Sequence, residues 1–188
     1  MDAPALIVID VQRAFDDPRW GERNNPEAEG RVAALLGAWR AHDAPVVHVR
    51  HRSTSPTGLF RGEGLAFKDE AVPVAGEPVI EKQVNSAFIG TDLEERLRGA
   101  GVETVVIVGL TTDHCCSTTA RMAGNLGFET WFVSDATATF ARRAPDGGLV
   151  DAETMHRTAL TSPSGEFAAI LDSAEAISRL RAWADRRA

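Results

Sequence analysis

Short apolar runs alternate with helix-like stretches along this chain of 188 residues, and that order limits the folds it can adopt. Six of the runs have the length and composition of strands, and they span residues 5–10, 45–50, 79–82, 104–109, 130–135 and 166–171. Helical patterning spans residues 27–42, 92–99, 116–126, 151–161 and 174–187. This alternation predicts a three-layer α/β/α sandwich, in which a mostly parallel six-stranded sheet lies between helices.

The composition is that of one ordinary globular domain, which we expect to cover residues 1–188. The formal net charge of -7 and the lack of a basic stretch argue against a nucleic-acid partner. The two cysteines are adjacent, so they cannot join distant parts of the fold, which is typical of a reducing compartment. No apolar run approaches the length of a membrane span, and the first residues do not resemble a signal peptide. We therefore expect a cytoplasmic protein without a membrane partner.

Residues 53–78 and 141–150 form two connections, rich in proline and glycine, that are longer than a compact domain requires. Connections of this kind are usually lids, binding loops or disordered segments. The glycines of the first connection neither follow a strand nor open a helix, which argues against a dinucleotide-binding loop. We expect a mobile lid there.

Three chemically active side chains follow separate strands of the predicted sheet. Asp10 ends the first run, Lys82 ends the third, and Cys115 comes shortly after the fourth. Because ligands of open α/β sheets bind outside the carboxyl ends of the strands, we expect these side chains to converge at one edge. A buried Asp10 carboxylate needs a partner, and Lys82 is the natural candidate. Only Lys68 and Lys82 are lysines among 20 basic residues, so Lys82 is an exception in this chain.

Cys115 has the setting of a nucleophile. It lies near the predicted start of the helix at residues 116–126, where unpaired N–H groups and the helix dipole favour negative charge. We expect its thiol to ionise more readily than a free thiol, and the thiolate is the nucleophilic form. Cys115 would then attack a carbonyl while Asp10 moves the proton and an ammonium stabilises negative charge. Cys116 is expected to pack in the core, and Asp113 to cap the helix.

Three motifs of the chain resemble those of the isochorismatase-like cysteine hydrolases, a family that includes nicotinamidase, N-carbamoylsarcosine amidohydrolase and ureidoacrylate amidohydrolase. The motifs are IDVQRAF at residues 9–15, EKQVNSAFIGTDLEERL at residues 81–97 and GLTTDHC at residues 109–115. The resemblance covers nearly the whole chain in the right order. It implies a Rossmann-like, isochorismatase-like hydrolase fold in which Asp10, Lys82 and Cys115 form the catalytic triad.

The resemblance also implies details that the residues alone do not. A cis peptide bond between Leu110 and Thr111 is expected to aim the Thr111 N–H, beside that of Cys115, at the substrate oxygen as an oxyanion hole. The implied reaction is hydrolysis of a small amide or a related C–N bond through a thioester at Cys115, with no cofactor. The substrate is a small molecule, and a homo-oligomer, either a dimer or a tetramer, is implied as well.

The chain departs from the metal-dependent nicotinamidases, which carry an Asp-x-His…His cluster after the second strand. Here His51 and Ser53 stand about where that aspartate and histidine belong. His48 and His51 are three residues apart, so on a strand they point to opposite faces and cannot share one ion. We therefore expect no metal, and the difference argues against nicotinamide as the substrate.

Five further residues are candidates for a substrate pocket, namely Gln12, Phe15, Trp20, Phe88 and His114. The aromatic side chains can form pocket walls, although scattered aromatic residues more often belong to a core or an interface. Gln12 either hydrogen-bonds near the aspartate of the first motif or is exposed. His114 is a polar residue of the first helical turn that can line the pocket.

Other functions are compatible with these residues. An isochorismatase-type enzyme would cleave a vinyl ether with Asp10 as the acid, although family members with that activity lack the cysteine. A thiol redox sensor or a catalytically silent binding protein is the alternative of another class. The adjacent Cys115 and Cys116 lack the Cys-X-X-Cys spacing of a redox pair, which argues against the sensor.

Overall fold

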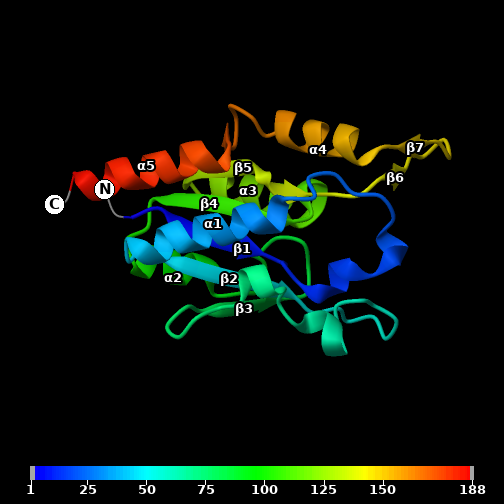
Figure 1. The fold of residues 1–188 in the computed structure, drawn as a ribbon, viewed down its shortest axis with the longest axis horizontal. Coiled ribbons are helices and arrows are strands. Elements are labelled where there is room, and N and C mark those ends of the chain that lie inside the picture. Colours follow the sequence, from blue (N-terminus) through cyan, green and yellow to red (C-terminus); the bar gives the residue numbers. More distant parts are fainter. Residues whose placement is uncertain (1–2, 187–188) are drawn as a thin grey trace.

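The computed structural model describes residues 3–186, and its centre is one sheet of six parallel strands in the order β3-β2-β1-β4-β5-β8 (Figure 1). The strands are β1 (Ala5–Ile9), β2 (Val46–His51), β3 (Val79–Lys82), β4 (Thr104–Leu110), β5 (Glu129–Ala138) and β8 (Ala169–Leu171). The predicted α/β class and the six-stranded sheet are therefore confirmed. Residues 1, 2, 187 and 188 lie outside the described residues.

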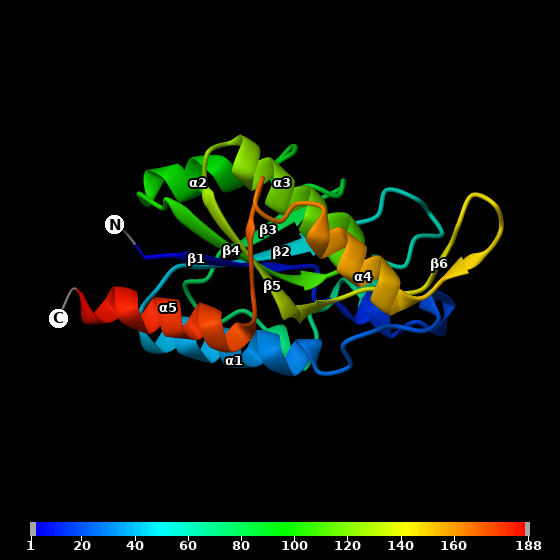
Figure 2. The same cartoon turned by 90° about the horizontal axis from the view of Figure 1, so that it is seen from above.

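Helices cover both faces of the sheet. Figure 2 shows α1 (Ala28–Ala41) and α5 (Ser173–Asp185) on one face, with α2 (Leu93–Gly99) and α3 (Ser117–Asn125) on the other. Strand β1 is buried on both faces, because Leu6 and Val8 pack toward the side of α1 while Ile7 and Ile9 pack toward the side of α2. This explains why the strands form near-continuous apolar runs instead of alternating ones.

The last two helices begin at acidic caps. The side chain of Asp151 accepts a hydrogen bond from the Thr154 N–H at the start of α4 (Ala152–Thr161), and Asp172 accepts one from the Glu175 N–H at the start of α5. The helix that we predicted at 174–187 ends at Asp185, and its last predicted residue lies outside the described part of the chain. Within residues 3–186, no helix is long and apolar enough to cross a membrane.

Both long connections contain short elements that the sequence did not predict. The 141–150 connection is partly a hairpin, in which β6 (Arg142–Arg143) pairs antiparallel with β7 (Leu149–Val150). The 53–78 connection contains the 3₁₀ turns η3 (Gly62–Leu65) and η4 (Asp69–Ala71). The hairpin and the first part of the 53–78 connection lie beyond the carboxyl ends of the strands, at the right of Figure 1, which is the edge where the site residues lie. Residues 74–78 of that connection run back to the start of β2 and lead into β3.

Gly109 allows β4 to pass close to the end of β1. Its φ is +117°, a conformation that L side chains rarely adopt, and a Cβ built there would lie 2.0 Å from the Ile9 carbonyl oxygen. The register between β4 and β5 also shifts between Ile107 and Gly109. The close contact keeps the end of β4, and therefore the turn that carries Cys115, against the end of β1.

We expect Gly109→Ala to lower the free energy of unfolding by about 2 kcal/mol or more, because the new Cβ meets backbone in a strained conformation. Urea denaturation followed by circular dichroism measures this loss. Gly37→Ala on the exposed side of α1 is the control, and it should be neutral or slightly stabilising, since its new methyl group would meet nothing within 4 Å and the site is helical. Equal stability of the two variants would contradict the expectation.

Candidate active site

Asp10, Lys82 and Cys115 meet at the carboxyl edge of the sheet. Asp10 follows β1, Lys82 ends β3, and Cys115 lies in the π-helical turn Thr112–Cys116 between β4 and α3. The Lys82 Nζ atom lies 2.6 Å from Asp10 Oδ2 and 3.3 Å from Cys115 Sγ. The side chains of Asp10 and Lys82 are 0% exposed, so this ion pair is fully removed from solvent. Asp10 has a φ of +52°, which an aspartate tolerates better than most residues.

The charges of the pair stabilise each other in a dry environment. Burial raises the pKa of Asp10, and the ammonium of Lys82 opposes this effect only in part. Burial alone would lower the pKa of Lys82, but the negative charges of Asp10 and Cys115 overcome it and raise that pKa. Asp10 Oδ1 is buried and has no hydrogen-bond partner within residues 3–186, so one carboxylate oxygen is free to accept a proton.

The prediction that the Cys115 thiol ionises readily is wrong for the free protein. Burial raises the pKa of Cys115, the charge of Asp10 raises it further, and Lys82 lowers it by less. The reason is local: Cys115 is the fourth residue of the turn Thr112–Cys116, and it is only 9% exposed. Loss of hydration therefore outweighs any benefit of the helix start, and the resting group is a thiol that needs a base.

Among residues 3–186, the side chains of Asp10, His51 and Cys115 form a group that could offer ligands to a metal ion. Their ligand atoms all lie within 4.8 Å of one another. The Lys82 ammonium, however, is within hydrogen-bond distance of all three, because it also lies 3.4 Å from His51 Nδ1. A metal ion would have to displace this ammonium. His48 lies apart from the group, with its Nε2 atom 2.8 Å from Glu77 Oε2.

A cavity of about 110 Å³ opens onto Cys115. One wall is aromatic: the Phe15 ring centroid lies 4.9 Å from that of Trp20 and 5.1 Å from that of Phe60. Thr111, another residue of the cavity lining, follows a cis peptide bond with Leu110. The residues that line the cavity are Phe15, Trp20, His51, Phe60, Asn85, Thr111, His114 and Cys115. Larger hollows of about 620 and 630 Å³ lie on the surface, but neither reaches the cysteine.

Two of the five predicted pocket residues do not line this cavity. Gln12 is buried and binds backbone: its Oε1 accepts from the His51 N–H at 2.7 Å, and its Nε2 donates to the His51 carbonyl at 3.1 Å. Phe88 packs with Phe128 in the core, with ring centroids 6.0 Å apart. Phe15, Trp20 and His114 do line the cavity.

Sequence reasoning missed Phe60 and Asn85 and left His51 undecided. Phe60 lies in the 53–78 connection, where pattern gives no contact information, and Asn85 lies within the second motif, three residues after Lys82. The expected helix cap at Asp113 is also wrong. Its carboxylate accepts hydrogen bonds from the Thr139 hydroxyl and from Arg142 Nε, and so joins this turn to the segment after β5.

Comparison with known proteins identifies the family of the chain. Residues 4–175 match the family model of the isochorismatase domain. The chain belongs to the isochorismatase family. It is 49% identical over 175 residues to YrdC, an isochorismatase family protein of Bacillus subtilis (strain 168), and the match covers 92% of this chain and 94% of YrdC.

Other members of the isochorismatase family agree with the fold and include an amidase. The crystal structure of an isochorismatase family protein from Chromobacterium violaceum ATCC 12472 is 43% identical, with a TM-score of 0.94 over 97% of this chain and 95% of that one. Nicotinamidase 3 of Arabidopsis thaliana is 31% identical, and the match covers 89% of this chain and 84% of that protein. The chain therefore belongs to a family of hydrolases, and its relatives include a nicotinamidase.

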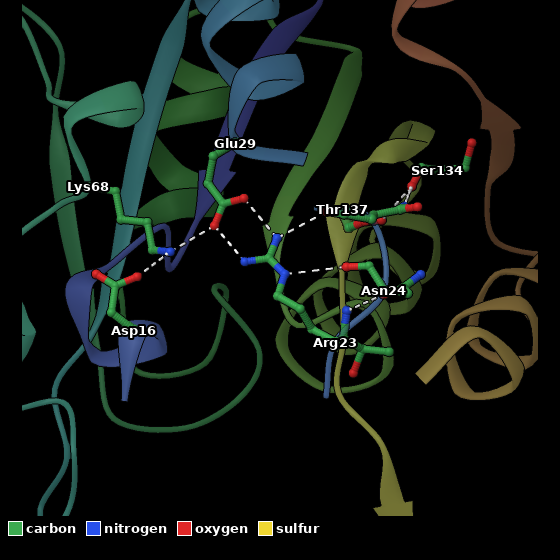
Figure 3. A network of polar contacts seen from close by, with 9 residues as sticks. Asp16, Arg23, Asn24, Glu29, Lys68, Ser134 and Thr137 are labelled. Carbon is green, nitrogen blue, oxygen red and sulfur yellow. Dashed lines mark hydrogen bonds and ion pairs between the residues drawn. The ribbon is translucent and has the colours of Figure 1, made fainter. Parts of the chain in front are cut away.

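In this family member a chain of ion pairs ties the 53–78 connection to the body of the protein. Figure 3 shows Glu29 of α1 between Arg23 and Lys68, at 2.7 and 2.8 Å, while Lys68 also reaches Asp16 at 2.7 Å. The Gln12 amide adds a second attachment, because its Nε2 lies 3.3 Å from the Leu65 carbonyl oxygen of the same connection. The 620 Å³ hollow beside the network is bordered by these mutually paired charges.

We expect Glu29→Gln to weaken the pH dependence of stability. Burial alone would raise the pKa of Glu29, but hydrogen bonds from Arg23 and Lys68 lower it from 4.5 to about 2. This stabilisation is present above the unfolded pKa and is lost as pH falls toward the folded pKa. Between pH 6 and pH 3 the wild type should therefore lose about 2 kcal/mol that the variant does not lose.

Urea denaturation at both pH values checks this expectation. The control is Asp69→Asn, which removes the exposed pair with Arg13 and should change stability by less than about 0.5 kcal/mol. If Glu29→Gln and the wild type lost the same stability between pH 6 and pH 3, the network would not hold Glu29 ionised.

Proposed function

We propose that this protein is a metal-independent cysteine hydrolase that cleaves a small amide or a related C–N bond. The observation that carries the proposal is the fully buried Asp10–Lys82 pair beside Cys115, with one oxygen of Asp10 free of partners among the described residues. A thiol that holds its proton needs a base within reach, and this oxygen is such a base. The amidase among the relatives supports the same bond type.

In the acylation step Asp10 accepts the thiol proton as Cys115 attacks the amide carbonyl. The negative charge moves from sulfur to the carbonyl oxygen, where the backbone N–H groups of Thr111 and Cys115 stabilise it. Lys82 stays protonated and keeps the second oxygen of Asp10 and the sulfur in place. Asp10 then returns its proton to the leaving nitrogen, so that an amine or ammonia departs and a thioester remains on Cys115.

In the deacylation step water hydrolyses the thioester. Asp10 takes a proton from the water, the hydroxyl adds to the carbonyl, and the C–S bond breaks. The sulfur recovers a proton from Asp10, and the carboxylic acid leaves. The overall reaction consumes one water and needs no redox partner. A cytoplasmic location and a homo-oligomeric state stay predictions that accompany this function.

Cys115→Ala should lower amide hydrolysis at least about a thousandfold, because the nucleophile is lost. Ammonia release from a panel of small amides, ureido acids and nicotinamide, with and without chelator, measures this and identifies the substrate. Cys116→Ala is the matched control, since Cys116 is buried in the core and should be dispensable.

Other outcomes of the panel separate the alternatives. A vinyl ether tested beside the panel, and cleaved equally by the wild type and by Cys115→Ala, would instead favour acid catalysis by Asp10. Turnover of nicotinamide that chelator abolishes would overturn the metal-independent mechanism. A wild type that neither hydrolyses any amide nor reacts with iodoacetamide at Cys115 would leave only a binding function.

The pH profile of Cys115 alkylation should report the protonation of Asp10. The reaction needs ionised Asp10, so its rate falls as pH drops through the pKa of Asp10, which burial raises above its usual value. Lys82→Met removes the charge that opposes this shift, so the acid limb should move to higher pH.

Initial rates with iodoacetamide between pH 4 and pH 9 give this profile. Arg98→Met on the exposed side of α2 is the charge-matched control and should leave it unchanged. Circular dichroism confirms that each variant is folded. An acid limb that stayed in place, or moved to lower pH, in folded Lys82→Met would contradict the role of Asp10 as the base.

A further inference from the structure

Lys82 uses all three of its N–H donors, and the third acceptor is His51. An ammonium group has three donors and no acceptor. Two of the donors reach Asp10 Oδ2 at 2.6 Å and Cys115 Sγ at 3.3 Å, and the third reaches His51 Nδ1 at 3.4 Å. Because Lys82 can only donate, His51 Nδ1 must accept and therefore carries no proton. The proton of the neutral imidazole is then on Nε2.

The His51 ring is held so that Nε2 is available to a ligand. The Gln12 amide binds both the N–H and the carbonyl of His51, and the Phe60 ring packs against the imidazole at 65° with centroids 4.9 Å apart. His51 lines the cavity that opens onto Cys115. Within residues 3–186 its Nε2 atom has no hydrogen-bond partner. A donor without a partner among the described residues, on a side chain that lines a cavity, fits an acceptor atom of a substrate.

The surroundings keep His51 neutral. The charged groups that act on it are Lys82 at the end of β3 and Asp10 after β1, and the Cys115 thiol in the turn before α3 also lies near. Burial lowers the pKa of His51, the charge of Lys82 lowers it further, and Asp10 opposes both. The ring thus stays an uncharged donor at neutral pH.

We propose that His51 is a substrate-binding residue that positions Lys82 through Nδ1 and donates a hydrogen bond from Nε2 to the substrate. The inference rests on the proposed function and narrows its substrate class. The preferred substrate is a small amide that carries a second acceptor, such as an ether or carbonyl oxygen, near the scissile group. A purely hydrocarbon amide of the same shape leaves the donor unpaired and binds less tightly.

Two substitutions separate the two contacts of His51. In His51→Asn the amide oxygen falls near the place of Nδ1 and can still accept from Lys82, but the donor at Nε2 is lost. In His51→Gln the amide nitrogen reaches the place of Nε2, but the acceptor for Lys82 is lost. A purely structural role would predict the same defect in both variants.

The probes are tetrahydrofuran-3-carboxamide and cyclopentanecarboxamide, which have similar shapes but differ in one ether oxygen. Each is tested as a ligand that protects Cys115 from iodoacetamide, so the measurement does not require turnover. In the wild type the ether amide should protect about five- to tenfold more tightly, the effect of one hydrogen bond. His51→Asn should abolish this preference with an unchanged pH profile of alkylation.

His51→Gln should keep the preference for the ether amide but shift the acid limb of the alkylation profile. The buried ammonium loses an acceptor and is held less firmly beside Asp10, so the acid limb should move to higher pH, the direction expected for Lys82→Met. His42→Asn, at the end of α1, is the histidine control and should change neither measurement. Identical behaviour of His51→Asn and His51→Gln would overturn the proposal.

Nitrogen NMR of the His51 imidazole tests the tautomer independently of catalysis. We expect the Nε2–H form at pH 7, and the preference should weaken in Lys82→Met. A dominant Nδ1–H form would falsify the inference even if amides are hydrolysed. Conversely, His51 could show the Nε2–H form while Cys115 is inert toward iodoacetamide. That result would contradict the proposed function but would support the contact between His51 and Lys82.

Discussion

The architecture of the site depends on one ion pair that is completely withdrawn from water. An unpaired carboxylate or ammonium at this depth would cost several kcal/mol, so Asp10 and Lys82 stabilise each other's charged form only if their strands keep their places. Asp10 comes from the central strand β1 and Lys82 from the edge strand β3, with β2 between them. The pair therefore spans three strands, and the sulfur of Cys115 approaches it from β4 on the other side. The strand order brings Asp10, Lys82 and Cys115 together, and the two buried charges are stable only in that arrangement.

The fold and the meeting of the three polar side chains could be predicted from the sequence because both follow from simple periodicity. Buried parallel strands form continuous apolar runs, and the first polar residue after such a run lies at the carboxyl edge of the sheet. Asp10 fulfils this rule directly, and Lys82, which follows Glu81, reaches the same edge as the last residue of β3. Cys115 follows it with a longer turn, whose π-helical form the sequence did not indicate. The hairpin Arg142–Val150 was missed because its paired segments are two residues each.

The ionisation of the thiol and the pocket walls could not be predicted, since both depend on distances between remote segments. Proximity to a helix start suggested an easily ionised Cys115, but burial beside a carboxylate reverses that expectation. Gln12 and Phe88 are neighbours of site residues in sequence, yet their side chains turn toward the backbone of β2 and toward the core. Phe60 comes from the 53–78 connection and reaches the cavity through packing against Phe15 and His51, which are remote from it in sequence.

The buried ion pair lies at the ends of strands, whereas much of the cavity wall comes from the connections between elements. The groups that we propose to react lie at the ends of β1 and β3 and in the turn before α3, whereas Trp20 and Phe60 belong to segments outside the sheet. Exchange of these segments can alter which molecule fits without disturbing the buried charges. One scaffold can in this way accommodate different substrates, because the segments that carry Trp20 and Phe60 can change while the buried ion pair of Asp10 and Lys82 keeps its partners.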